Sequence, residues 1–120
     1  MGTDRSCMII DSHPVVRLGI RRLLEPSWDF EELADGRGAV DLLNSVGHFE
    51  VAIIEMRSAG RNAPSGTTTI RELLDQQPSL GVVAHGGRVD RHAIVEALDA
   101  GASAYVSKRS SPSTCSSSGP

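Results

Sequence analysis

Short apolar runs alternate with segments of helical periodicity, and this alternation constrains the fold more than any other feature of the chain. The apolar runs cover residues 7–10, 28–34, 51–54, 80–84 and 104–106. Between them, apolar side chains recur at the spacing of one face of an α-helix. Strands that alternate with helices pair in parallel, so the sequence predicts an α/β fold with a doubly wound, five-stranded parallel sheet. The compact run 51–54 is expected at its centre.

The helix boundaries follow from proline and capping residues. Pro14 stands where the first turn of a helix tolerates proline, and Pro26 ends the same apolar pattern. Pro78 closes the third helical segment, and Asp90 is expected to cap the fourth. The side chains expected on the inner face of the fourth helix are Ile94, Ala97 and Leu98.

The chain of 120 residues has the size of one domain, to which we assign residues 1–109. Residues 110–120 are rich in serine and offer nothing to bury, which predicts a disordered or non-native tail. A normal fifth helix is therefore not expected.

Charge and composition exclude several classes of partner. A formal net charge of -3 gives no electrostatic reason for direct contact with nucleic acid. The sequence has neither a membrane-length apolar run nor the pattern of a secretory signal, so we expect a cytoplasmic protein without membrane contact. Cys7 and Cys115 lack metal-ligand spacing, and no disulfide is expected between them.

Four motifs together point to one family. Residues 9–24 read IIDSHPVVRLGIRRLL, and residues 97–108 read ALDAGASAYVSK. Between them stand Ala34-Asp35-Gly36 and the strand VAIIE at 51–55. These residues closely resemble bacterial response-regulator receivers of the NarL/LuxR type, which carry a LuxR-type helix-turn-helix output domain.

The resemblance implies a receiver, or flavodoxin-like, topology with site residues at the carboxyl ends of the first, third and fifth strands. It also implies transfer of a phosphoryl group from a sensor kinase to an aspartate. In the family an acidic cluster holds Mg²⁺ and a lysine meets the phosphoryl oxygens, because the charge of the transferred group must be neutralised.

Three features of the site depart from this pattern. The family's adjacent pair of acids is Asp11-Ser12 here, so a hydroxyl replaces one carboxylate. Glu55 stands at the phosphoacceptor aspartate, and its extra methylene moves the carboxylate by about 1.5 Å. The family's Ser or Thr on the fourth strand aligns with Ala84 or Gly86, and neither has a hydroxyl. We therefore expect a degenerate phosphoacceptor pocket, followed by a loop a few residues longer than usual.

Two further positions retain the family's residue type, Lys108 for the lysine and Tyr105 for the switch aromatic. One interpretation is that Glu55 places a permanent negative charge near Lys108 and imitates the phosphorylated state. The alternative is an ion pair in an inactive site, retained because an unpaired buried charge is costly. Tyr105 is either the switch residue or a half-buried strand aromatic.

These departures predict an atypical receiver, or pseudo-receiver, that binds partners and is not an enzyme. We expect it to act without phosphorylation in a transcriptional regulator, through homodimerisation or through contacts with a LuxR-type DNA-binding domain outside this chain. Two alternatives stay open: a pocket that senses a small molecule, and a receiver still phosphorylated on Glu55 or Asp11. Candidate polar contacts on the dimer face are Arg88, Asp90, Arg91, Glu96 and Asp99.

The histidines His13, His48, His85 and His92 show none of the spacings that bind zinc through paired histidines. We therefore expect no metal site and no cofactor, and we interpret these side chains as surface or cap residues.

Overall fold

The computed structural model describes residues 5–57, 64–86 and 91–107, which form a five-stranded, wholly parallel sheet covered by helices. The strands are β1 (Ser6–Ile10), β2 (Asp29–Leu33), β3 (Val51–Glu55), β4 (Gly81–Gly86) and β5 (Ala104–Ser107). The helices are α1 (Pro14–Leu24), α2 (Ala39–Val46), α3 (Gly66–Gln76) and α4 (Arg91–Ala100). The strand order β2-β1-β3-β4-β5 is the flavodoxin-like order with β3 in the centre. The predicted fold class is confirmed.

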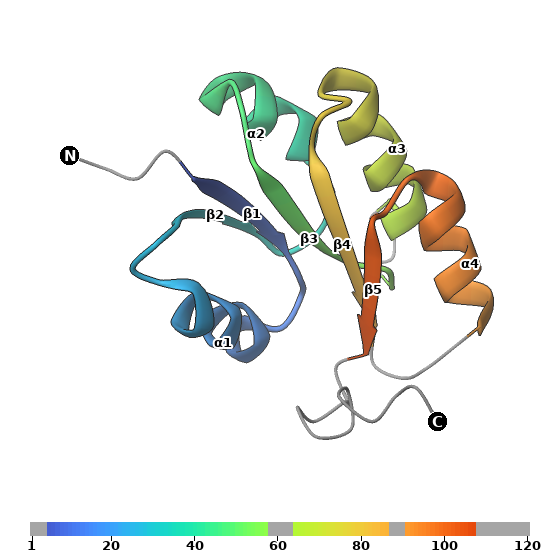
Figure 1. The fold of residues 1–120 in the computed structure, drawn as a ribbon, viewed down its shortest axis with the longest axis horizontal. Helices are drawn as coiled ribbons and strands as arrows, with labels where there is room; N and C mark the ends of the chain where they lie inside the picture. The colour runs from blue at the N-terminus through green and yellow to red at the C-terminus, as the bar shows by residue number, and fades with distance from the viewer. Residues whose placement is uncertain (1–4, 58–63, 87–90, 108–120) are drawn as a thin grey trace.

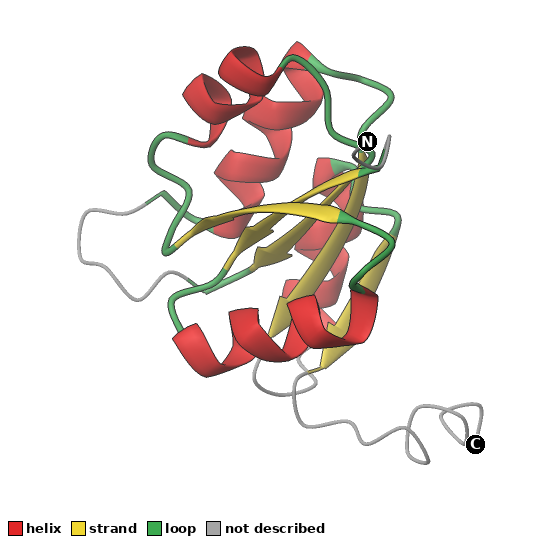
Figure 2. Ribbon diagram, turned by 90° about the vertical axis from the view of Figure 1, so that its left-hand side faces the viewer, coloured by secondary structure: helices red, strands yellow, loops and turns green. Residues whose placement is uncertain are grey.

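The helices divide unequally between the two faces of the sheet. Among the described residues, α1 is the only helix on one face, while α2, α3 and α4 lie side by side on the other (Figure 1). Figure 2 shows the twisted sheet between these layers. The chain runs outward from β1 to β2 and then back past β1 to β3, so right-handed crossovers place α1 opposite the later helices. The reversal also makes the carboxyl ends of β1 and β3 the place where such sheets bind ligands.

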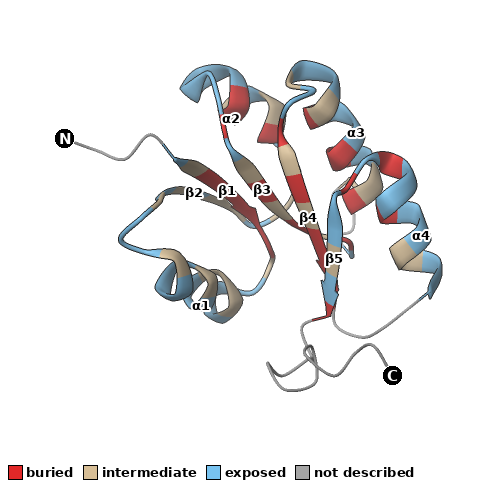
Figure 3. Ribbon diagram, in the orientation of Figure 1, coloured by how far each residue is buried: buried red, intermediate tan, exposed pale blue. Residues whose placement is uncertain are grey.

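The hydrophobic core fills the space between the sheet and the three helices α2 to α4. Met8 and Ile10 of β1 belong to it, as do alternate residues of β3 and β4, because successive strand side chains point to opposite faces. Among its fully buried large side chains are Phe49, Ile70 and Leu73. Figure 3 shows buried positions along the sheet and on these helices, whereas α1 has no buried residue.

Helix α3 begins directly against the end of β3. Ser65 caps the helix, because its hydroxyl oxygen accepts a hydrogen bond of 3.1 Å from the backbone N–H of Thr68. The N–H of Gly66 donates to the carbonyl of Met56 over 3.2 Å, and a Cβ at Gly66 would stand 2.6 Å from the Cα of Met56. Only glycine allows so close an approach, and it holds strand and helix together at the base of their connecting loop.

One predicted core position is wrong. Leu98 is 48% exposed, whereas Ala97 and Ala100 are buried on α4 and Ile94 is half-buried. Residues three apart share a helix face, so the two alanines set the face that meets the sheet and Leu98 is turned away from it. The small alanine side chains also let α4 pack closely on α3.

Several sequence predictions lie outside the described residues. They are the Asp90 cap, the absence of a fifth helix, the tail at 110–120 and the environment of Cys115. Cys7 is described: it is a free, fully buried cysteine, and burial raises the pKa of its thiol to about 12. Within the described ranges, no helix combines the length and apolarity that a bilayer crossing requires.

Candidate functional site

Polar side chains from three neighbouring strands meet at the carboxyl edge of the sheet. Asp11 follows the last residue of β1, Glu55 is the last residue of β3, and His85 is the fifth residue of β4. The strand register brings them together, because Ile10 pairs with Ile54 and Glu55 pairs with His85. The parallel topology thus collects groups that are far apart in the sequence.

Asp11 is the buried centre of this cluster. Its side chain is fully buried, and its Oδ1 accepts a hydrogen bond of 2.7 Å from the backbone N–H of His13. The same oxygen lies 2.8 Å from His13 Nδ1, while Oδ2 lies 3.2 Å from Nε2 of the buried His85. Arg17 donates to the Asp11 carbonyl over 2.6 Å and pairs with Glu32, which fixes the start of α1. Asp11 is therefore held from several sides.

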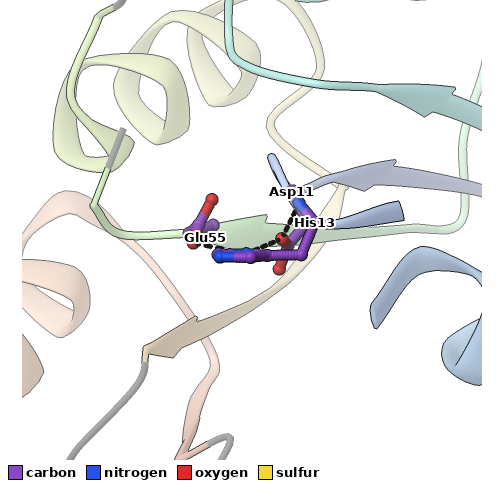
Figure 4. Close-up of side chains that lie close together, drawn as sticks. All are labelled: Asp11, His13 and Glu55. Atoms are coloured by element: carbon purple, nitrogen blue, oxygen red, sulfur yellow. Dashed lines mark hydrogen bonds and ion pairs between the residues drawn. The ribbon is translucent and has the colours of Figure 1, made fainter. Parts of the chain in front are cut away.

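Glu55 is tied to the residue after Asp11. Its Oε1 accepts two hydrogen bonds of 3.0 Å from Ser12, one from the backbone N–H and one from the hydroxyl. Its Oε2 lies 3.5 Å from His13 Nδ1, so the imidazole stands between the carboxylates of Asp11 and Glu55 (Figure 4). The two acids and the imidazole form one connected group at the mouth of the site.

The aligned sensor positions differ in environment. Ala84 is buried in the core cluster, on the face toward α2 to α4. Gly86 ends β4 and pairs with Ser107 of β5, which is buried and carries a hydroxyl. Tyr105 is half-buried and packs against the core cluster. Lys108 lies outside the described residues, so its predicted pairing with Glu55 stays a prediction.

Sequence reasoning missed the two histidines of the site. His85 was expected on the surface but is buried beside Asp11, because its position on β4 faces α1 at the level of Asp11. His13 is 60% exposed, yet its ring lies between two carboxylates. A histidine two residues after an aspartate that directly follows a strand is the signal that indicates His13, whereas the spacing of paired histidines does not.

Comparison with known proteins agrees with the geometry. A family model of the response regulator receiver domain matches residues 7–117. The chain belongs to this family. The receiver domain is 31% identical over 113 residues to the nitrate/nitrite response regulator protein NarP of Escherichia coli (strain K12), covering 92% of the chain and 51% of that protein.

A second relative is the transcriptional regulatory protein DegU of Brevibacillus brevis. It is 29% identical to the receiver domain over 103 residues, which cover 84% of the chain and 42% of that protein. The chain thus spans about half the length of the curated relatives it matches, or less.

Solved structures show the same fold. A two-component response regulator of the LuxR family from Aurantimonas sp. SI85-9A1 is 27% identical, with a TM-score of 0.77 over 93% of the chain and 79% of that structure. The isolated receiver domain of RcsB from Salmonella enterica serovar Typhimurium, determined with the phosphomimetic BeF₃⁻, is 23% identical. Its TM-score is 0.78 over 92% of the chain and 82% of that structure.

Magnesium, which the family implies, fits the donor groups of this receiver domain poorly. Mg²⁺ takes oxygen ligands in near-octahedral geometry. Ser12 supplies a neutral hydroxyl where the family has a carboxylate, and that hydroxyl is bonded to Glu55. A nitrogen, His13 Nδ1, stands between the two remaining carboxylates. The donor chemistry of the site differs from the one that magnesium prefers.

The interface candidates on α4 are partly described. Arg91, Glu96 and Asp99 are exposed, as polar contacts of a dimer face require. Arg88 and Asp90 lie outside the described residues. Which of these residues meets a partner stays a prediction.

Proposed function

We propose that this receiver domain controls its output without phosphorylation, as an atypical or pseudo-receiver. One observation carries the proposal. The carboxylate at the phosphoacceptor position, that of Glu55, is bonded through Oε1 to both the backbone N–H and the hydroxyl of Ser12. The residue that replaces the family's second acid therefore holds the acceptor side chain.

Phosphoryl transfer depends on the placement of the acceptor and on neutralisation of the transferred charge. Glu55 is longer than the family's aspartate, and a displacement of about 1 Å at the reacting atom can cost on the order of 10²-fold in rate. Neither Ala84 nor Gly86 offers a hydroxyl to the phosphoryl oxygens. These losses act on different parts of the reaction and support a non-catalytic role.

The domain would then control its output through a surface that contacts a partner. We infer that it belongs to a longer cytoplasmic transcriptional regulator and acts through homodimerisation, or through a LuxR-type DNA-binding domain beyond this chain. The length of the relatives supports this reading. So does an apolar groove between α1 and the sheet, because exposed apolar patches on small proteins mark interaction sites. Its apolar lining residues are Val16, Ile20, Leu23, Leu24, Ile53, Val83 and Val106.

The test is incubation with Mg²⁺ and a small phosphodonor such as acetyl phosphate, followed by intact-mass measurement. We expect no added phosphoryl group on the wild-type chain. The matched control is the double variant Ser12→Asp/Glu55→Asp, which restores both acids and should gain phosphoryl modification. Stoichiometric modification of the wild type would overturn the proposal.

The interpretation of Glu55 as a permanent phosphate mimic has its own test. If its charge holds an active shape, Glu55→Gln should weaken dimerisation in sedimentation equilibrium while the fold persists in circular dichroism. If the charge is only structural, the dimerisation constant should stay within about twofold of the wild type, which is less than 1 kcal/mol.

Small-molecule sensing in the degenerate pocket is the less favoured alternative. The cavity that Glu55 lines together with Asp35 and Thr69 has a volume of about 10 Å³, which is room for about one water molecule, and neither Asp11 nor Ser12 lines it. A metabolite would need the surrounding groups to move. A melting-temperature screen against metabolites would revive this alternative if one compound raised the midpoint in proportion to its concentration.

A further inference from the structure

The geometry points to a transition-metal site in place of the family's magnesium site: Asp11, His13 and Glu55 bind a divalent ion of the zinc class. The ligand atoms of these three residues lie within 4.8 Å of one another. The inference does not rest on the proposed function, because a receiver can bind such an ion whether or not it accepts a phosphoryl group.

The donor set is one imidazole nitrogen and two carboxylate oxygens. Zinc binds histidine nitrogen and carboxylate oxygen, and three protein ligands leave a fourth position for water or a partner group. Imidazole suits zinc, copper, iron and nickel, whereas sites for magnesium are built from oxygen. With Ser12 in place of the second acid, the donors that remain at this edge of the sheet are two carboxylates and the nitrogen of His13, a set that suits zinc better than magnesium.

The two donor separations that involve His13 are close to what zinc requires, and the two carboxylates lie within 4.8 Å of each other. With zinc-to-ligand distances of about 2.0–2.2 Å in a tetrahedron, two ligand atoms stand roughly 3.4 Å apart. Nδ1 of His13 lies 3.5 Å from Oε2 of Glu55 and 2.8 Å from Oδ1 of Asp11. The first separation already fits, and the second must open by about 0.6 Å to reach the tetrahedral value. The exposed ring of His13 can make that movement.

Both carboxylates are also oriented by a second layer of hydrogen bonds and ion pairs. Ser12 holds Oε1 of Glu55, which leaves Oε2 on the side of His13. The N–H of His13 holds Oδ1 of Asp11, and the buried His85 lies 3.2 Å from Oδ2. Outer partners of this kind orient the ligands of protein metal sites and raise their affinity. Ser12, which weakens the site for magnesium, is thus a positioning residue for zinc.

The chain offers a matched control within itself. His48 and Glu50 form another exposed histidine–carboxylate pair, with 3.4 Å between Nε2 and Oε1. His48 is 57% exposed, close to the 60% of His13. Among the described residues, the group of Asp11, His13 and Glu55 is the only one with three convergent donors. His13→Ala and His48→Ala therefore remove similar side chains from different settings.

The experiment is calorimetric titration of the chelator-treated 120-residue chain with Zn²⁺ and with Mg²⁺, paired with Co²⁺ titration followed by visible absorption. We expect one Zn²⁺ per chain, bound at least tenfold more tightly than Mg²⁺. His13→Ala and Glu55→Gln should each weaken Zn²⁺ binding by at least about tenfold and reduce the Co²⁺ absorption. His48→Ala should leave both unchanged. Melting curves of each variant check that it is folded.

Three outcomes would overturn the inference. They are tighter binding of Mg²⁺ than of Zn²⁺, equal Zn²⁺ affinity of His13→Ala and wild type, and loss of binding in His48→Ala. In each case the cluster would be a hydrogen-bonded network and any bound zinc adventitious. Phosphorylation of the wild type would reject the proposed function but leave these titrations intact, so the two ideas can fail separately.

Discussion

The two faces of the sheet differ in how closely they are packed and in which side chains they carry. The face toward α2, α3 and α4 is apolar and closely packed, and it holds the core cluster with Ile70 and Leu73 at zero exposure. The face toward α1 carries the buried Asp11–His85 pair, and α1 itself has no buried residue. The first face holds the core cluster, while the second combines buried residues such as Cys7 and Ile9 with polar and apolar groups that are open to contact. The difference separates the residues that make the fold from those free to change function.

The largest expected effect contrasts two leucines on opposite faces. Leu73→Ala should lower the free energy of unfolding by about 2–5 kcal/mol, because it leaves a cavity in the core. Leu23→Ala on α1, where Leu23 is 85% exposed, should change it by no more than about 0.5 kcal/mol. Urea unfolding of both variants measures the contrast. A comparable loss of stability in Leu23→Ala would mean that this face of α1 is covered, and it would contradict the difference between the two faces.

A smaller effect is expected at the polar pair on the α1 face. His85→Leu removes the imidazole beside the buried Oδ2 of Asp11 and should cost about 1–3 kcal/mol, because a buried carboxylate loses a partner. His92→Leu is the control, since His92 is exposed on α4 and pairs only loosely with Glu96. Thermal unfolding should separate the two variants. Equal melting temperatures would show that the Asp11–His85 pair does not stabilise this face.

The β1 side of the same face can be probed through Cys7. Met8 and Ile10 point into the core, so Cys7 points toward α1 by strand alternation. Its pKa of about 12 keeps the thiol protonated near neutral pH, so in a Cys115→Ser background an aromatic disulfide reagent should react slowly unless urea is added. Stability should fall as pH rises from 9.0 toward about 12, because the unfolded chain ionises this thiol first. Fast labelling without urea would show that α1 leaves β1 open.

The smallest expected effect lies away from both faces. The hydrogen bonds of Arg37 hold the pKa of the Asp35 carboxyl below its usual value. The ionised pair therefore contributes its stability above the ordinary carboxyl pKa, and that contribution is lost as pH falls through the lowered pKa. Arg37→Ala should move the NMR titration midpoint of Asp35 upward. An unchanged midpoint would show that Arg37 does not lower the pKa of Asp35.

Much of the fold could be predicted from the sequence because the spacing of apolar residues follows from which side of each helix or strand is buried. Pro14 opens α1 as expected, and β3 covers the predicted apolar run at the centre of the sheet. Leu98 was misplaced because Ala100, which shares the packed face with the correctly placed Ala97, looks less hydrophobic than a leucine. The spacing of apolar residues therefore predicted the positions of the helices and strands better than it predicted which individual side chains are buried.

The candidate site was predicted only in part. The family motifs indicated Asp11, Ser12 and Glu55, but not that Ser12 would bond the Glu55 carboxylate, since this contact joins residues 43 positions apart. His85 and His13 were set aside because their spacing matched no paired-histidine pattern. Strand register places His85 beside Asp11, and the turn after β1 places His13 there. Neither feature produces a periodic pattern in the sequence.

The contact between Gly66 and Met56 has a consequence for how this protein can evolve. Because the two backbones touch, the ends of the segment that joins them stay fixed whatever its length. Each doubling of the length of a closed loop costs only about 0.6 kcal/mol in closure entropy. Insertions there are consequently cheap and leave Glu55 where it is. The length of this segment and the position of Glu55 can therefore change independently, provided that position 66 never gains a side chain.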